Sequence, residues 1–324
     1  MVVPTWATIR PVVAPLQCFA NPAVVCEGWY AVGPARRIRA GDRRRVWLGA
    51  RDLMLYRDRG GVLRAVDRAC PHLGADLAHA TVVGQGLQCV FHQWRWGPDG
   101  TCIAGGGVGS GARLRTYAVR ERWGLAWIWA GDAPAYELPE PDPANTRVVR
   151  LPSQTIGAHG HLVIGNGVDV THLAPLHGLR TESAPAIAEA TATRFAIDVH
   201  LRIGATAMRR VLGLAGKTAS WRFTAIGPSL AWVSVTEPIR FELLLTARPL
   251  RDGGCATKSL FFLPRLADLA RALPMMVAVT WADRVVLEGL DFRPGFVASD
   301  ALFERYARMV DALPVWRRSD ADAT

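Results

Sequence analysis

Two short stretches, Cys70-Pro71-His72 and Cys89-Val90-Phe91-His92, decide how this sequence is interpreted. Each stretch offers one thiolate and one imidazole, and residues 73–88 separate the two. Thiolates and imidazoles are the side chains with which proteins hold zinc and iron–sulfur centres. Because the spacing is C-x-H and then C-x2-H, we expect two loops to bring four ligands to one metal centre.

The order of the four ligands discriminates between two kinds of centre. Zinc fingers usually pair cysteine with cysteine and histidine with histidine, whereas cysteine and histidine alternate here. A Rieske [2Fe–2S] centre has two cysteines on one iron and two histidines on the other. The sequence therefore predicts that Cys70, His72, Cys89 and His92 bind such a cluster, and a zinc knuckle or ordinary core residues are the alternatives.

Length and composition favour a globular chain of two domains. The sequence has 324 residues, 50% of them hydrophobic, which is long for one core and too apolar for global disorder. Two of its six cysteines belong to these stretches and the other four show no regular spacing, so we expect no disulfide framework and a reducing, cytoplasmic location. Prolines and Arg10 interrupt the apolar N-terminus, which predicts neither a signal peptide nor a transmembrane span.

The formal net charge of +10 comes almost entirely from arginine. Apart from Arg43-Arg44-Arg45 the charge is dispersed, so we expect no nucleic-acid partner. A solvated arginine-rich surface accounts for this charge. A docking face for an acidic electron carrier is the alternative, because complementary charge raises the rate of encounter.

Alternating apolar residues and turn signals predict short antiparallel strands in the first part of the chain. A proline-rich stretch follows, as is typical of linkers. We expect an N-terminal extension (1–27), an all-β domain with the metal loops (28–132), a linker (133–145) and a second domain (146–324).

Residues 104–111 read AGGGVGSG and suggest a nucleotide-binding loop by glycine content alone. No helical pattern and no Lys-Ser/Thr pair follows, so we expect a flexible loop. Because nicotinamide and flavin fingerprints are lacking, electrons would have to come from another protein.

The second domain carries a dense run, NGVDVTHLAPLHG, that starts at Asn166. On a helix Asn166, Asp169 and His172 would lie near one face, and Pro175 is expected to interrupt that helix before His177. Two imidazoles and a distant carboxylate make the facial triad of non-haem Fe(II) oxygenases. Either histidine alone would be an ordinary core or surface residue.

Period-two alternation over residues 195–262 predicts an antiparallel sheet. Helical patterns follow over residues 264–272, 277–290 and 299–313. A curved sheet with helices packed against it is an α+β domain.

With both motifs placed, the chain resembles the α subunits of Rieske non-haem iron oxygenases over about residues 28–315. The resemblance implies an all-β Rieske domain followed by a helix-grip catalytic domain. Asn166, Asp169, His172 and His177 match the family's N-x2-D-x2-H-x4-H segment. The resemblance implies His172 and His177 as ligands of a mononuclear Fe2+. It also implies Asp169 as the bridge to a cluster histidine, here His92, of a neighbouring subunit.

The third iron ligand in the family is an aspartate on a C-terminal helix. Residues 281–288 resemble that segment, which implies Asp283 as the ligand, with Glu288 and Asp291 as the fallback choices.

The resemblance implies an oxygenase that uses O2 and electrons from a separate ferredoxin or reductase, in a homotrimer. Residues 91–102 resemble 3-ketosteroid 9α-hydroxylases and residues 166–173 resemble cholesterol 7-desaturases. We therefore expect hydroxylation or desaturation of a hydrophobic, polycyclic substrate such as a steroid, a sterol or a secondary metabolite. An oxygenase or O-demethylase of smaller aromatic compounds is the alternative. A Rieske electron carrier without catalysis and an iron-free lipid-binding module are the rival classes.

Overall fold

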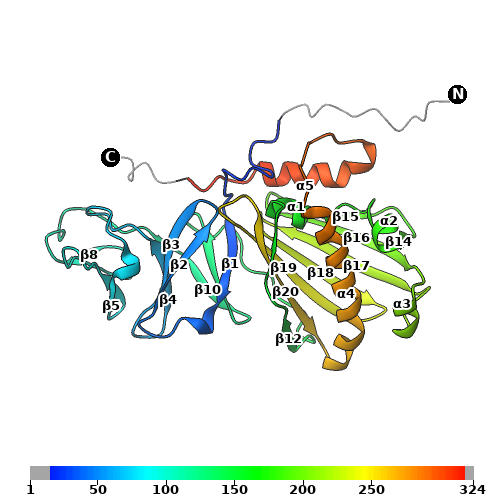
Figure 1. Cartoon of the computed structure of the whole chain (residues 1–324), viewed down its shortest axis with the longest axis horizontal. Helices are drawn as coiled ribbons and strands as arrows, with labels where there is room; N and C mark the ends of the chain where they lie inside the picture. Colours follow the sequence, from blue (N-terminus) through cyan, green and yellow to red (C-terminus); the bar gives the residue numbers. More distant parts are fainter. Residues whose placement is uncertain (1–14, 318–324) are drawn as a thin grey trace. The chain divides into compact units, whose positions relative to one another are not determined.

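Figure 1 shows the computed structural model of the chain, which describes residues 15–317. Most of the expected N-terminal extension, residues 1–14, lies outside the described residues. The chain divides into two compact units. Among the described residues, the β unit holds residues 27–137, 250–252 and 316–317, and the α+β unit holds residues 15–26, 138–249 and 253–315.

The β unit contains three small antiparallel sheets, as the sequence predicts for an all-β domain. Their strand orders are β1 (Gly28–Pro34), β11 (Leu125–Ala130) and β10 (Val119–Arg122); β2 (Arg43–Leu48), β3 (Arg51–Arg57), β4 (Leu63–Asp67) and β9 (Thr116–Tyr117); and β5 (Thr81–Val83), β6 (Gly86–Gln88), β7 (Arg95–Trp96) and β8 (Cys102–Ala104). Two short 3-10 helices, Ala35–Arg37 and Leu77–His79, complete the unit.

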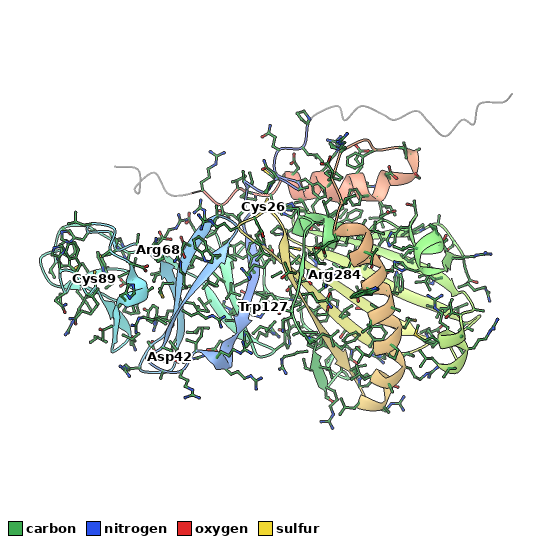
Figure 2. The ribbon with its side chains drawn as sticks, viewed as in Figure 1. Cys26, Asp42, Arg68, Cys89, Trp127 and Arg284 are labelled. Atoms are coloured by element: carbon green, nitrogen blue, oxygen red, sulfur yellow. The ribbon has the colours of Figure 1, made fainter. Side chains whose placement is uncertain are left out.

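Strand β11 is the central strand of the first sheet, and its sequence explains that position. All six residues of LAWIWA are buried, and they include Trp127, which Figure 2 labels. A strand that is covered on both faces reads as a continuous apolar run, whereas a half-exposed strand alternates. The second and third sheets share a core that includes Met54, Val66, Leu87 and Trp96, and Cys70 and Cys89 of the cysteine–histidine loops belong to the same core.

The α+β unit is built on one nine-stranded antiparallel sheet. Seven strands follow one another in the order β12 (Arg147–Arg150), β20 (Cys255–Leu263), β19 (Phe241–Pro249), β18 (Leu230–Glu237), β17 (Thr218–Ile226), β16 (Arg194–Ile203) and β14 (Leu179–Thr181). Strands β13 (Gln154–Ile156) and β15 (Ala186–Ala190) pair with β20 and β16. The antiparallel sheet predicted over residues 195–262 is confirmed.

The helices of this unit are α1 (Gly160–Gly165), α2 (Leu173–His177), α3 (Ala207–Val211), α4 (Leu266–Leu287) and α5 (Ala301–Asp311), with a 3-10 turn at Ala298–Asp300. Figure 1 shows α4 running along one face of the sheet. Within residues 15–317, no helix is long and apolar enough to cross a membrane.

Helix α4 corrects the prediction of two separate helices over residues 264–272 and 277–290. It is one helix of 22 residues that continues through Pro274. Proline removes one backbone hydrogen bond and disfavours a helix interior. Here Ala272 and Met275, on either side of Pro274, are buried in the core. Because tertiary packing supplies most helical stability in proteins, it keeps the two halves in one helix.

The segment from Asn166 to His177 also differs from its prediction. The helix break lies between α1 and α2, before His172, and Asn166 is already the C-terminal cap of α1. Pro175 sits inside the first turn of α2 and does not interrupt it. The first four backbone N–H groups of a helix have no partner within the helix, so proline loses nothing at this position.

Candidate metal centres and active site

The two cysteine–histidine stretches form loops with the same backbone hydrogen bonds. The Gly74 N–H donates to the Cys70 carbonyl, and the Cys70 N–H donates to the Ala75 carbonyl, both at 2.9 Å. The loop at Cys89 repeats these two bonds at 3.1 and 2.9 Å. Each cysteine therefore begins a tight turn that projects the following residues from the end of a strand.

The fourth residue after each cysteine adopts a left-handed backbone conformation. Gly74 has a φ of +75° and Gln93 has a φ of +59°. This conformation is easy for glycine, but it costs a residue with a side chain about 1–2 kcal/mol. The Gln93 amide offsets part of this cost, because it donates to the Val90 carbonyl at 3.2 Å and contacts Gln88.

The four predicted cluster ligands lie on these two loops. The two cysteines are 2% and 3% exposed, His92 is exposed, and the His72 and His92 rings are 4.6 Å apart. Burial raises the pKa of the Cys70 thiol and neighbouring Cys89 raises it further, so two adjacent thiolates require a positive centre. Two buried cysteines and two more accessible histidines fit a Rieske cluster, in which the cysteines bind one iron and the histidines bind the other.

Trp94 packs directly on this site. Its ring stacks on His72 with 4.0 Å between centroids and an interplanar angle of 8°. The glycine-rich segment, which we expected to be a flexible loop, packs against the same indole. A Cβ added at Gly107 would lie 2.1 Å from Trp94 Cζ3. Gly107 is thus required by its close approach to Trp94, a role that the glycine content of the segment does not indicate.

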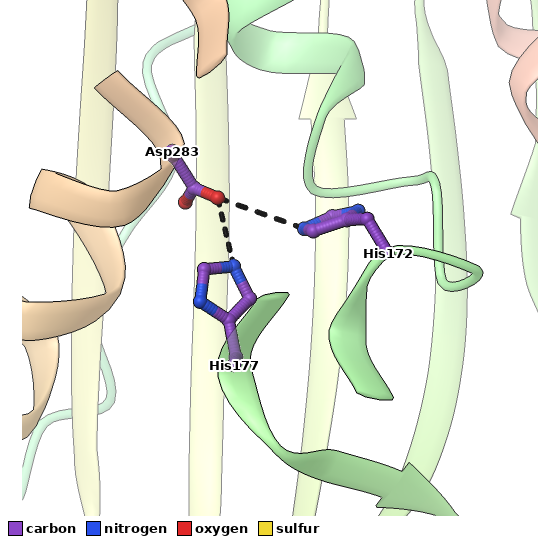
Figure 3. Close-up of side chains that lie close together, drawn as sticks. All are labelled: His172, His177 and Asp283. Carbon is purple, nitrogen blue, oxygen red and sulfur yellow. Dashed lines mark hydrogen bonds and ion pairs between the residues drawn. The ribbon is translucent and has the colours of Figure 1, made fainter. Parts of the chain in front are cut away.

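A second group of ligand-type side chains lies in the α+β unit (Figure 3). His172 precedes α2, His177 ends it, and Asp283 projects from α4. The Nε2 atoms of His177 and His172 lie 2.7 and 3.7 Å from Asp283 Oδ1. One ligand atom from each residue lies within 4.8 Å of the others. Within the described residues, no other group of three His, Cys, Asp or Glu side chains meets this criterion. Two imidazoles and one carboxylate with an open side fit a non-haem iron site.

Asp169 lies next to this trio. Its Oδ2 atom is 3.4 Å from Nδ1 of His172, and its Oδ1 atom accepts hydrogen bonds from the N–H and hydroxyl of Thr171. Burial would raise the pKa of Asp169, but the contacts with His172 and Thr171 lower it below its ordinary value. A carboxylate beside the outer nitrogen of a metal-binding imidazole fixes the orientation of that ring.

The other residues predicted for the site, Asn166, Glu288 and Asp291, are not part of the trio. Asn166 is the C-terminal cap of α1 and lines a cavity beside the trio. Glu288 pairs with Arg284 at 3.5 Å, and the exposed Asp291 pairs with Arg293 at 2.8 Å. Neither fallback carboxylate belongs to the trio.

The cavity beside the trio, which we call the inner chamber, lies between the sheet and α4. His172, His177 and Asp283 form part of its wall. Most of the remaining wall is apolar, including Phe223, Val233, Phe241, Leu243, Met275 and Met276. Apolar walls with a few polar groups are typical of sites for hydrophobic small molecules.

Arg209 supports the backbone next to His177, a position that its sequence does not indicate. It is 6% exposed, and its guanidinium donates to the carbonyls of His177 at 2.5 Å and of Gly178 and Gly204 at 3.3 Å. It thereby fixes the end of α2, where Gly178 adopts a left-handed conformation with a φ of +60°. In the sequence, Arg209-Arg210 looks like two surface charges, and only the fold reveals the buried one.

Comparisons with known proteins agree with this picture. Residues 28–118 match the family model of the Rieske [2Fe-2S] domain. Cholesterol 7-desaturase from Bombyx mori is 35% identical over 159 residues, which are 47% of this chain and 35% of the relative. The oxygenase component of 3-ketosteroid-9-alpha-monooxygenase from Rhodococcus rhodochrous is 28% identical over 169 residues, 48% of this chain and 45% of the relative. The chain thus covers less than half the length of these curated relatives.

Among solved structures, dicamba monooxygenase bound to 3,6-dichlorosalicylic acid superimposes with a TM-score of 0.65. The match is 20% identical in sequence and covers 91% of this chain and 97% of that one. This likeness concerns the fold of nearly the whole chain. The chain therefore carries a Rieske [2Fe–2S] domain, has the fold of dicamba monooxygenase, and resembles the Rieske non-haem iron oxygenases as its two motifs predict.

Proposed function

We propose that this chain is the oxygenase component of a Rieske non-haem iron oxygenase. The observation that carries the proposal is the meeting of His172, His177 and Asp283 at the wall of an apolar chamber. A Rieske electron carrier needs only the cluster domain, and an iron-free lipid-binding module needs only the chamber. Neither rival accounts for two imidazoles and a carboxylate arranged as an iron site in a chain with a cluster domain.

In this proposal Cys70, His72, Cys89 and His92 hold the [2Fe–2S] cluster, and the trio holds Fe2+. When bound, the cluster supplies electrons and the mononuclear iron supplies O2 activation. We propose residues 28–132 as the cluster domain, residues 133–145 as the linker and residues 146–324 as the catalytic domain.

The chain's own residues prepare the iron site. Asp169 orients His172 through its outer nitrogen, and Arg209 fixes the backbone of His177. The apolar walls of the inner chamber exclude water and bind a hydrophobic substrate beside the open side of the trio. Asn166 adds a polar group to the same wall.

We propose a steroid, sterol or similar polycyclic compound as the substrate, and hydroxylation or desaturation as the reaction. The apolar chamber and the steroid- and sterol-directed relatives support this choice. A smaller aromatic compound is the second candidate, favoured by the fold shared with dicamba monooxygenase. The proposed partners are a separate ferredoxin or reductase and, in a trimer, two further copies of the chain.

Isotope labelling tests this function. The purified protein, a ferredoxin–reductase pair, NADH and 18O2 are incubated with a panel of 3-ketosteroids, sterols and methoxylated benzoates. We expect 18O in a hydroxylated product, or the loss of two hydrogens in a desaturated one, and neither product with His172→Ala. If the protein transfers electrons to a second carrier but oxidises no compound of the panel, the carrier class replaces the oxygenase.

A further inference from the structure

One surface hollow of the β unit is lined mainly by arginines, and we call it the arginine hollow. Its five cationic residues come from the first 3-10 helix, the turn after it and the start of β2: Arg36, Arg37, Arg39, Arg43 and Arg44. All five are exposed. Among the described residues of the wall one carboxylate is present, that of Asp42, which Figure 2 labels. Positive charge therefore dominates the hollow.

The arginines of the hollow take no part in ion pairs within the described chain. Other arginines of the β unit do: Arg45, next to the hollow in sequence, pairs with Asp52. For the five arginines of the hollow, no carboxylate oxygen within residues 15–317 lies closer than 4.0 Å. The Asp42 carboxylate accepts the backbone N–H of Arg39 at 2.9 Å, so it closes the turn and pairs with none of these guanidiniums.

The backbone beneath the arginine hollow is held in place. The Arg57 guanidinium donates to the carbonyls of Ala35 and Ile38 at 3.1 and 2.7 Å, and both of these residues are buried. Arg57 is itself paired with Glu121 at 2.6 Å, so its own charge is balanced. A partner therefore meets positive charges on a backbone that needs no ordering on binding, which lowers the cost of association.

The arginine hollow adjoins the segment that follows Cys70. The Arg43 Nε atom donates to the carbonyl of Ala78 at 2.7 Å, and Ala78 lies both in the second 3-10 helix and in the wall of the hollow. Leu77, in the same helix, belongs to one core with both cysteines of the proposed cluster site. A protein that docks on the hollow therefore rests on a segment that packs with the cluster cysteines.

The charge and place of the hollow restrict the partner that it suits. Unpaired exposed cations favour a partner with an acidic surface, because complementary charge speeds encounter and sets orientation. The proposed function also needs a one-electron donor from outside the chain. Single-stranded nucleic acids are acidic too, but their binding sites use aromatic side chains on which bases stack. The described residues of this wall include no aromatic side chain.

We propose that the arginine hollow is the docking surface for an acidic one-electron carrier of the ferredoxin type. This inference rests on the proposed function, because it locates the place where electrons enter. The carrier gives up one electron in the docked complex, and the centre held by the two cysteine–histidine loops takes it up. The arginines steer and orient the carrier and are neither oxidised nor reduced.

Binding measurements test the inference without turnover. Isothermal titration follows an oxidised, acidic plant-type [2Fe–2S] ferredoxin as it binds to the purified protein with its metals. The variant Arg36→Gln/Arg37→Gln/Arg44→Gln removes three charges of the hollow. At a salt concentration of about 0.01 M, we expect it to weaken the Kd about tenfold or more. At about 0.1 M the Debye length falls from about 30 to about 10 Å, so the parent should lose most of this advantage.

A charge-matched variant separates the hollow from the overall charge of the chain. Arg210→Gln/Lys217→Gln/Arg305→Gln removes three exposed positive charges of the α+β unit, and its Kd should stay within about twofold of the parent.

Replacement of the same three arginines of the hollow by lysine keeps the charge. This variant should also bind within about twofold of the parent, even if the glutamine variant folds poorly. Reduction of the cluster by the reduced ferredoxin, followed by stopped-flow absorbance, should slow about tenfold in the hollow glutamine variant alone.

Four results would overturn the inference. These are no binding of the ferredoxin to the parent, an unchanged Kd in the hollow glutamine variant, an equal loss in both glutamine variants, and tighter binding of duplex DNA than of ferredoxin through the hollow.

Iron content and product formation, measured on the same preparations, distinguish this inference from the proposed function. If ferredoxin binding depends on the hollow but the trio holds no iron and no compound is oxidised, the oxygenase function fails and the docking surface stands. If iron is present and products form while ferredoxin binding ignores the hollow, the inference alone fails.

Discussion

Replacing Gly107 with alanine should displace Trp94 from its contact with His72. The added Cβ would lie 2.1 Å from Cζ3 and 2.3 Å from Cε3 of the indole. Non-bonded carbons are comfortable at about 3.5–4.0 Å, so the ring or the glycine-rich segment must move by about 1.4 Å or more. Because the indole stacks on His72 with 4.0 Å between ring centroids, a moving ring disturbs the imidazole as well.

Overpacking of this kind costs about 1–3 kcal/mol. We therefore expect Gly107→Ala to lower the free energy of unfolding of the β unit by that amount. The neighbouring Gly106 provides a matched control, because its added Cβ would meet Trp94 Nε1 at 3.6 Å, an ordinary contact. Gly106→Ala should change the unfolding free energy by less than about 1 kcal/mol.

The assay is urea unfolding followed by tryptophan fluorescence, with the visible circular dichroism of the cluster recorded on the same samples. We expect Gly107→Ala to shift the urea midpoint downward and to alter the visible bands, whereas Gly106→Ala changes neither. Equal unfolding free energies and identical visible spectra for the two variants would show that the glycine-rich segment does not position Trp94.

Three other substitutions test separate parts of the account. Asp169→Asn should leave both metals bound but nearly abolish turnover, as measured by iron content and product formation. Arg209→Met leaves the His177 carbonyl without its buried donor and should cost about 2–4 kcal/mol of unfolding free energy with weaker iron retention. Burial lowers the pKa of His159 from 6.5 to about 4. As the pH falls, the imidazole is therefore protonated in the unfolded chain before it is protonated in the folded chain. His159 therefore contributes stability that is complete above about pH 6.5 and is lost towards pH 4, by at most about 1.4 kcal/mol per pH unit.

The controls for these variants are direct. Normal single-turnover rates in Asp169→Asn would refute its role, and full iron content with unchanged stability in Arg209→Met would refute the backbone clamp. His159→Asn keeps a residue that caps α1 well. Urea titrations at pH 7, 6 and 5 should therefore show a flatter loss of stability in that variant, and parallel curves for variant and parent would contradict the burial argument.

The sequence predicts the sheets well and singles out the candidate ligand motifs, because both depend on local patterns. Strand β16 alternates apolar and polar residues from Ile197 to Ile203, and burial alternates with the same period in the fold. The spacing C-x-H and C-x2-H requires only that two short loops, one after β4 and one after β6, pack on one small core. These features follow from residues that are close in sequence.

Features that depend on distant partners could not be predicted. The continuation of α4 through Pro274 depends on a core formed by strands far earlier in the chain. Arg209 becomes important because it reaches carbonyls at residues 177, 178 and 204, and the role of Gly107 appears only when Trp94 is placed. In each case the local propensity indicates something else, and the tertiary contact decides.

We propose that His172, His177 and Asp283 form a mononuclear iron site in a chain that also carries a Rieske domain. Iron per chain and the cluster's visible absorption in Asp283→Ala and Glu288→Ala test it most directly. We predict that Asp283→Ala loses the iron beyond the about two atoms of the cluster while the visible bands persist, and that Glu288→Ala keeps all of its iron. Full iron in Asp283→Ala together with iron loss in Glu288→Ala would contradict the ligand assignment.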